Sequence, residues 1–138
     1  MENFCEITFF HHIGSNKRRN QDALFNGESV FQYKLKIAEK RLETRPHSIV
    51  GVADGISNSN RSEKASKLAM QLLSQMEILS RQTIYDLQSN LSVELAVDYF
   101  GSATTFVAAE IDQTTRKAKI LSVGDSRAYL IDTQGNWQ

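Results

Sequence analysis

The segment SIVGVADGISNSN, residues 48–60, decides the fold expected for this chain. Its apolar run at 49–53 is typical of a buried strand, and the carboxylate of Asp54 follows where the apolar residues end. Gly55 comes next, and glycine allows the backbone to turn tightly or to approach a ligand closely. An acid followed by glycine can present a carboxylate and a bare carbonyl oxygen to a hard cation. The same pattern also fits an Asx turn between a strand and a helix, so this segment alone leaves both interpretations open.

The composition indicates one domain without a charge bias. The chain has 138 residues, 41% of them hydrophobic, and its 16 Lys and Arg balance 16 Asp and Glu. A net charge of zero gives no reason to expect nucleic acid or a membrane as partner. Cys5 is the only cysteine, so no disulfide can form within the chain. Neither a signal peptide nor a run of roughly 18 apolar residues is present, and we therefore expect a soluble, cytoplasmic protein.

The rest of the pattern predicts strands and two helices. We expect strands at 4–13, 23–25, 30–37, 101–111, 117–123 and 127–131, and helices at 60–80 and 84–99. Asn60 and Glu63 are spaced as a capping box for the first helix. Residues 34–45 are expected to form a charged connector. His11 and His12 would face opposite sides of a strand, so we interpret them as structural and not as metal ligands.

Three acids stand at strand ends or turns, namely Asp22, Asp54 and Asp125. If they cluster, their repulsion calls for divalent cations, and oxygen ligands suit Mg²⁺ or Mn²⁺ better than zinc. Their spacing does not show that they converge. Three consecutive cations at 17–19 precede Asp22, either as a solvated loop or as an anion subsite.

Four segments, in order, resemble the metal-dependent protein phosphatases of type 2C. The segment from Gly14 through RNQD at 19–22 resembles the first acidic block of that family, and VADG at 52–55 resembles the central metal block. GSATT at 101–105 resembles the Gly-Thr-Thr strand start, and VGDSRAYL at 123–130 resembles the block after a hairpin. The resemblance implies an α+β fold, a four-layer α/β/β/α sandwich of two mainly antiparallel sheets flanked by helices. It covers only the first half or somewhat more of a family domain, so we expect residues 1–138 to be its N-terminal part, truncated before the C-terminal part.

The resemblance also implies a reaction. Two Mn²⁺ or Mg²⁺ ions would lie at one end of the sandwich, with a third, weaker position beside them. Asp54 would bridge the two ions, the Gly55 carbonyl would bind one, Asp22 would hold the pair directly or through water, and Asp125 would serve the third position. Water activated by the ions would hydrolyse phosphoserine or phosphothreonine in a phosphorylated protein substrate. Lys17, where many members carry a phosphate-binding arginine, joins Asp22 and Asp54 as a catalytic candidate.

Several departures from the family pattern leave alternatives open. Lys17 can bind phosphate as a point charge but not with the bidentate geometry of arginine, and Arg18 or Arg19 could take that role if the loop shifts register. Gln21 stands where some relatives carry glutamate, and Ile56 stands where eukaryotic relatives carry a histidine credited as general acid. Two further family Asp ligands would lie beyond residue 138, so we expect this chain to be weakly active or inactive and the full-length product to be active. The alternatives are a non-catalytic phosphatase-like binding or regulatory module, and a small α/β domain whose resemblance is due to chance.

Overall fold

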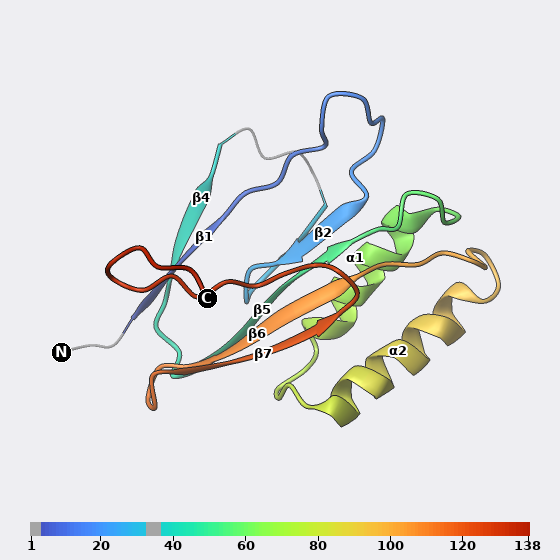
Figure 1. Ribbon diagram of the computed structural model, residues 1–138. Helices are drawn as coiled ribbons and strands as arrows, with labels where there is room; N and C mark the ends of the chain where they lie inside the picture. The colour runs from blue at the N-terminus through green and yellow to red at the C-terminus, as the bar shows by residue number, and fades with distance from the viewer. Residues whose placement is uncertain (1–3, 33–36) are drawn as a thin grey trace.

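The computed structural model describes residues 4–32 and 37–138, which form two antiparallel sheets and two helices (Figure 1). The larger sheet has the order β3-β2-β5-β6-β7 and the smaller sheet pairs β1 with β4. This architecture confirms the expected α+β sandwich. The bounds are β1 Cys5–Phe9, β2 Asp22–Phe25, β3 Val30–Phe31, β4 Glu39–Glu43, β5 His47–Asp54, α1 Ser62–Leu73, α2 Arg81–Leu95, β6 Phe106–Asp112 and β7 Lys117–Val123.

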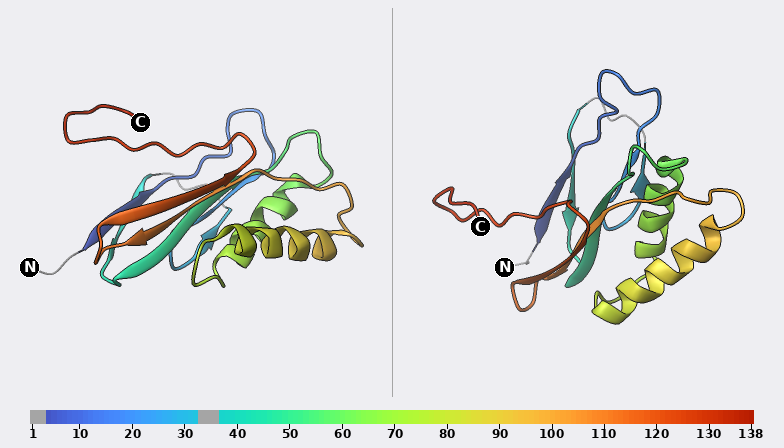
Figure 2. Two further views of the ribbon diagram at one scale, coloured as in Figure 1. Left: turned by 60° about the horizontal axis from the view of Figure 1, so that its bottom comes forward. Right: turned by 45° about the vertical axis from the view of Figure 1, so that its right-hand side comes forward.

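The elements are arranged in layers around the larger sheet. Both helices cover one face of this sheet, and the β1–β4 pair lies on the opposite side (Figure 2). These layers match three of the four that were expected. Within residues 4–32 and 37–138, no helix covers the outer side of the β1–β4 pair.

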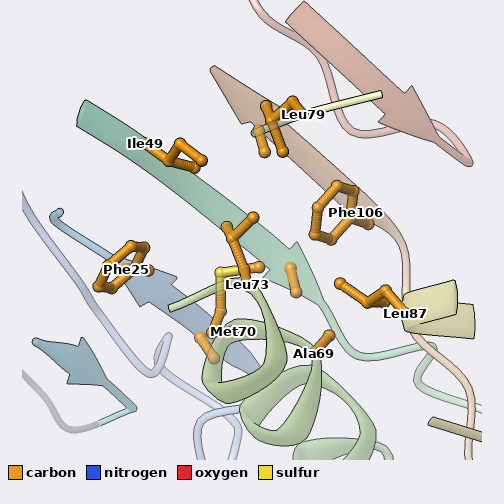
Figure 3. Close-up of a cluster of buried hydrophobic side chains, with 11 residues drawn as sticks. Phe25, Ile49, Ala69, Met70, Leu73, Leu79, Leu87 and Phe106 are labelled. Atoms are coloured by element: carbon orange, nitrogen blue, oxygen red, sulfur yellow. The ribbon is translucent and has the colours of Figure 1, made fainter. Parts of the chain in front are cut away.

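The hydrophobic core lies between the larger sheet and the helices (Figure 3). Alternate strand residues point to one face of a sheet, and this face carries small and aromatic side chains toward α1. Helix α1 contributes residues at spacings of three and four, as a helix with one apolar face does. The buried set comprises Ala23, Phe25, Ile49, Ala53, Ala69, Met70, Leu73, Leu79, Leu87, Phe106 and Ala108. Full burial of each large side chain stabilises the fold by about 1.5–3 kcal/mol.

Both helices begin and end at other residues than predicted. The first was predicted over 60–80, but α1 ends at Leu73 and the chain turns before α2. The predicted Asn60 capping box is wrong, because the N-cap is Arg61, in a left-handed conformation (φ 48°) with no capping side chain. Asn60 instead donates a hydrogen bond to the Phe100 carbonyl (3.2 Å). The true capping box begins α2, where Ser80 and Thr83 bond reciprocally.

Several predicted bounds of the strands also need correction. The strand expected at 4–13 ends at Phe9, and the strand expected at 101–111 begins only at Phe106. The expected connector at 34–45 contains a strand, β4, which pairs antiparallel with β1. Residues 127–131 form no strand, and only Ile131 makes an isolated bridge, to Trp137. Of the strand predicted at 30–37, Val30–Phe31 is confirmed, whereas positions 33–36 lie outside the described residues.

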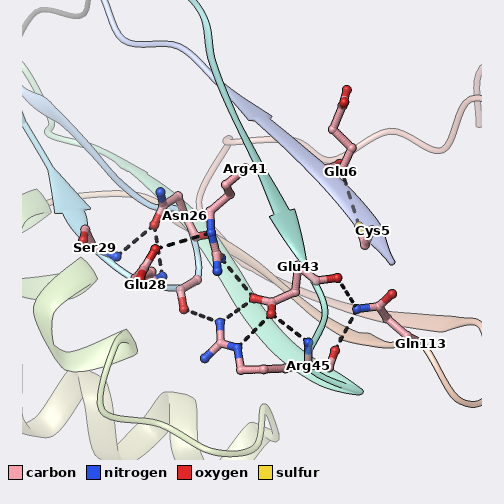
Figure 4. Close-up of polar contacts among 10 residues, drawn as sticks. Cys5, Glu6, Asn26, Glu28, Ser29, Arg41, Glu43, Arg45 and Gln113 are labelled. Atoms are coloured by element: carbon pink, nitrogen blue, oxygen red, sulfur yellow. Dashed lines mark hydrogen bonds and ion pairs between the residues drawn. The ribbon is translucent and has the colours of Figure 1, made fainter. Parts of the chain in front are cut away.

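A buried charged cluster joins the end of β4 to the larger sheet (Figure 4). Glu43 is only 1% exposed and accepts hydrogen bonds from Arg41 Nη1 (3.0 Å) and Arg45 Nε (2.8 Å). Arg41 also donates to the Asn26 carbonyl at 2.9 Å, in the turn after β2. Gln113 Nε2, beyond β6, donates to the Glu43 carbonyl at 2.8 Å. Arg41 and Arg45 flank Glu43 in the chain, and Arg45 also donates to the Gly27 carbonyl after β2 at 2.7 Å. The cluster therefore links the end of β4 to the turn after β2 and to the residue after β6, and so fixes the smaller sheet against the larger one.

Neither described helix combines the length and the apolar character needed to cross a lipid bilayer.

Candidate metal and phosphate site

The pairing of β2 with β5 brings two of the predicted acids together. The antiparallel register places Asp22, the first residue of β2, opposite Asp54, the last residue of β5. Directly opposed residues of neighbouring strands point to the same face, with their Cβ atoms about 4.5–5.5 Å apart. Both side chains are exposed at this end of the sheet, and their carboxyl groups are within hydrogen-bonding reach.

The proximity of the two acids changes the pKa of Asp22. Partial loss of hydration at the strand ends, the hydrogen bond with Asp54 and the negative charge of Asp54 raise the pKa of Asp22 to about 6, and the positive charge of Lys17 opposes this shift. Two carboxylates side by side favour a shared proton or a bound cation. The pair offers only oxygen donors, which are the ligands that Mn²⁺ and Mg²⁺ prefer.

Two threonines before β6 hold the backbone of Asp54. The Asp54 carbonyl accepts hydrogen bonds from Thr105 N (2.8 Å) and Thr104 Oγ1 (2.9 Å). In return, Asp54 N donates to Thr105 Oγ1 at 3.2 Å. These contacts fix the strand end, so the Asp54 carboxylate has a defined position relative to β6.

Gly55 lies where other backbone segments approach closely. Its N–H donates to the Gln21 carbonyl at 3.0 Å, and Ser66 Oγ of α1 donates to the same carbonyl at 2.5 Å. A Cβ atom on Gly55 would lie 2.6 Å from that carbonyl oxygen and 2.7 Å from the Ser62 carbonyl oxygen. Only glycine fits, and its packing keeps the loop before Asp22, the end of β5 and the start of α1 together.

Asp125 lies at the same end of the sheet but does not join the pair. It is exposed in the turn after β7, and the next residue, Ser126, is linked to Thr105 by a hydrogen bond between their hydroxyls (2.5 Å). In the described parts of the chain, no three acidic, histidine or cysteine side chains gather as a group that could hold an ion. The structure therefore brings together Asp22 and Asp54 but not Asp125.

Lys17 lies beside the acid pair. Its Nζ donates hydrogen bonds to Gln21 Oε1 and to Ser57 Oγ (2.9 Å), and its charge acts on Asp22. Ile56, which follows Gly55, is 45% exposed and offers no proton donor on its side chain. The three departures noted in the sequence, at 17, 21 and 56, thus lie around one site.

The residues that support the acids were not among the predicted site residues. Thr104 and Thr105 belong to the segment at 101–105 that resembles a family motif. Their hydrogen bonds to the backbone of Asp54 cannot be predicted from the sequence of that segment. Ser62 and Ser66 are buried on α1 and bond to Gln21, through its Nε2 (2.7 Å) and its carbonyl. A signal was present, because serines four residues apart within the apolar stripe of a helix indicate a polar contact across that face.

A comparison with curated proteins relates the chain to an enzyme. It is 35% identical over 98 residues to the serine/threonine phosphatase stp of Listeria monocytogenes, and the match covers 60% of this chain and 38% of that protein. The chain thus spans well under half the length of this relative. No protein-family model and no solved structure matches it. The similarity supports a relationship to serine/threonine phosphatases at this coarse level.

Proposed function

We propose that residues 1–138 form the N-terminal part of a metal-dependent protein serine/threonine phosphatase domain of type 2C. The observation that carries the proposal is the Asp22–Asp54 pair, which the β2–β5 register creates at one end of the sandwich. The similarity to a serine/threonine phosphatase supports the same class of reaction. The substrate would be a phosphorylated protein.

The residues around the pair have distinct roles in this proposal. Asp22, Asp54 and the Gly55 carbonyl would hold two Mn²⁺ or Mg²⁺ ions, and Asp125 would contribute to a third, weaker position. Bound ions would supply an activated water and neutralise charge on the phosphoryl group. Lys17 would bind a phosphate oxygen as a point charge, since its ammonium already lies next to Asp22. Thr105 would orient Asp54 through its backbone.

A second candidate, a non-catalytic phosphatase-like binding module, has its own support. Among the described residues, no third acid joins Asp22 and Asp54 in a group that could hold an ion. The Gln21 amide already donates a hydrogen bond to Ser62 Oγ. A site of this kind could retain a phosphorylated partner without hydrolysing it.

Metal titration tests the proposal on the chain itself. We expect calorimetry to show Mn²⁺ binding that weakens roughly tenfold or more in Asp22→Asn and Asp54→Asn. Asp98→Asn, which removes an exposed acid after α2, is the matched control and should bind as the unaltered chain does. Equal Mn²⁺ affinity in all four proteins would refute the metal site.

Hydrolysis of a phosphoserine peptide separates the two candidates. We expect weak or no turnover by the 138-residue chain. A longer chain that continues into the two further acids of the family should turn over the peptide in a Mn²⁺-dependent manner. Retention of the peptide without turnover by that longer chain would favour the binding module.

A further inference from the structure

A cluster of cations lies next to the acid pair, between the loop before β2 and the start of α1. Its members are Arg18, Arg19, Arg61 and Lys64, which we call the basic ledge. The three arginines and Glu63 help to line a cavity of about 330 Å³ at this junction. Arg18, Arg19 and Arg61 are exposed, so their guanidinium groups are accessible to a partner.

The ledge has more positive charge than its neighbours balance. Arg19 Nη1 (3.1 Å) and Arg61 Nε (2.7 Å) both contact the same oxygen of Glu63, Oε1. Glu63 is thus one carboxylate shared by two guanidinium groups. Neither Arg18 nor Lys64 forms an ion pair with any residue in 4–32 or 37–138. An incoming anion would therefore meet two unpaired cations and two that are only partly neutralised.

The ledge is also held in place before any partner binds. Arg61 and Lys64 both lie over the ring of Tyr99, with the cations 5.8 Å and 5.5 Å from its centroid. Such cation–π contacts limit the motion of long side chains. The Glu63 contacts orient Arg19 and Arg61 in the same way, so less conformational entropy is lost when an anion binds.

The ledge is continuous with the acid pair. Gln21, directly before Asp22, donates through Nε2 to Ser62 Oγ at the start of α1 (2.7 Å) and accepts from Lys17. One loop therefore carries Lys17 on the side of the acids and Arg18 and Arg19 on the side of the ledge. An extended peptide advances about 3.3–3.6 Å per residue, so residues close to a phosphoserine at the acid pair would reach the ledge.

We propose that the basic ledge binds anionic groups, carboxylate or phosphate, on residues that flank the phosphorylated residue of a protein substrate. This inference rests on the proposed function and gives that site a preference for acidic or multiply phosphorylated sequences. Arginine suits the task because its planar guanidinium can pair with both oxygens of a carboxylate or phosphate. A peptide is favoured over nucleic acid because the cations are confined to one patch in a chain with zero net charge.

Peptide binding to the full 138-residue chain tests the ledge by fluorescence anisotropy. The probes are phosphoserine peptides that differ only in their flanking residues, Gln, Glu or a second phosphoserine. We expect the Glu peptide to bind roughly three- to tenfold more tightly than the Gln peptide, and the doubly phosphorylated peptide more tightly still. In Arg18→Gln/Lys64→Gln this preference should weaken clearly, because only Arg19 and Arg61, which share Glu63, remain. The matched control Arg81→Gln/Lys117→Gln, which removes two exposed cations elsewhere, should keep it.

Two further probes distinguish this inference from the proposed function. An unphosphorylated Glu peptide, measured without Mn²⁺, should still bind more weakly to Arg18→Gln/Lys64→Gln than to the control, even if the acid pair binds no metal. An equal affinity of the ledge variant and the control for every acidic peptide would overturn the inference. Tighter binding of a single-stranded oligonucleotide than of any peptide, lost in the ledge variant, would overturn it in favour of nucleic acid.

Discussion

At the scale of single residues, the acid pair depends on a position that accepts only glycine. In Gly55→Ala the new Cβ would lie 2.6–2.7 Å from two backbone oxygens, which cannot move aside as a side chain does. We expect a loss of about 1–3 kcal/mol in the free energy of unfolding, measured with urea, and weaker Mn²⁺ binding because the end of β5 must shift.

Gly14→Ala is the control for this substitution. Gly14 has φ +84°, and no atom lies within 4 Å of the position that a Cβ would take there, so alanine adds backbone strain of about 1–2 kcal/mol without crowding. Both variants should lose stability, but only Gly55→Ala should lose affinity for Mn²⁺. Full Mn²⁺ affinity in Gly55→Ala would contradict this account.

Glu43 should make the stability depend on pH in acid solution. Hydrogen bonds from Arg45 and the charges of both arginines outweigh burial and lower the pKa of Glu43 from 4.5 to about 2. Since the folded pKa lies below the unfolded one, the stabilisation is present above pH 4.5 and declines as the pH falls toward 2. It amounts to about 3 kcal/mol.

The variant Glu43→Gln isolates this contribution. Between pH 5 and 3 its urea midpoint should fall less than that of the unaltered chain, although it should be less stable at pH 7 because two arginines lose a buried partner. Glu39→Gln, on the same strand but exposed, should keep the original pH profile. Identical profiles for the two variants would show that the cluster does not control acid unfolding.

The acid pair also shows what a sequence can reveal about single residues. Asp54 was recognisable because an apolar run ends at it, and Asp22 because it follows a polar loop. Their proximity depends on the β2–β5 register, which aligns residues 32 positions apart and leaves no trace in local spacing. The same limit explains Asp125, whose turn reaches the same sheet end without its carboxylate joining the pair.

At the scale of elements, the start of α2 offers a clear test of capping. Ser80 Oγ accepts a hydrogen bond from Thr83 N at 3.1 Å and satisfies one of the free N–H groups of the helix. Ser80→Ala should lower the free energy of unfolding by about 1 kcal/mol. In Ser89→Ala, inside the same helix and exposed, stability should instead rise by about 0.5 kcal/mol, because alanine favours the helix. Urea unfolding measures both, and equal effects would argue against the cap.

Strands could be predicted from the sequence where the local pattern of apolar residues agrees with the pairing in the sheet. The strand at 117–123 was predicted with its observed bounds, and the apolar run at 49–53 lies inside β5. Strand β4 has the sequence EKRLE, with one apolar residue, so its local pattern does not indicate the strand that forms by pairing with β1. Residues 127–131 have strand-like composition, but among the described residues no strand pairs with them, and composition alone does not form the hydrogen bonds of a sheet.

At the scale of the whole molecule, the larger sheet is apolar on both faces. One face packs on the helices, and the other carries Leu24, Val50, Val52, Val107, Ala109 and Ile120. On this second face the β1–β4 pair leaves a cavity of about 370 Å³, lined mainly by apolar side chains. Val52 and Ile120 are each 46% exposed, so the face is only partly covered.

This half-covered face should bind an apolar dye. We expect the chain to increase the fluorescence of anilinonaphthalene sulfonate while its unfolding remains cooperative, because exposed apolar patches attract such probes and favour association. Val52→Thr/Ile120→Thr keeps the β-branched shape while adding two hydroxyls to the face, so it should reduce both the fluorescence and any concentration-dependent association seen by sedimentation. Val97→Thr, 87% exposed beyond α2, changes a valine outside the sheet and should reduce neither. If all three proteins bind the dye equally, the uncovered face is not the apolar surface that controls the behaviour of this chain in solution.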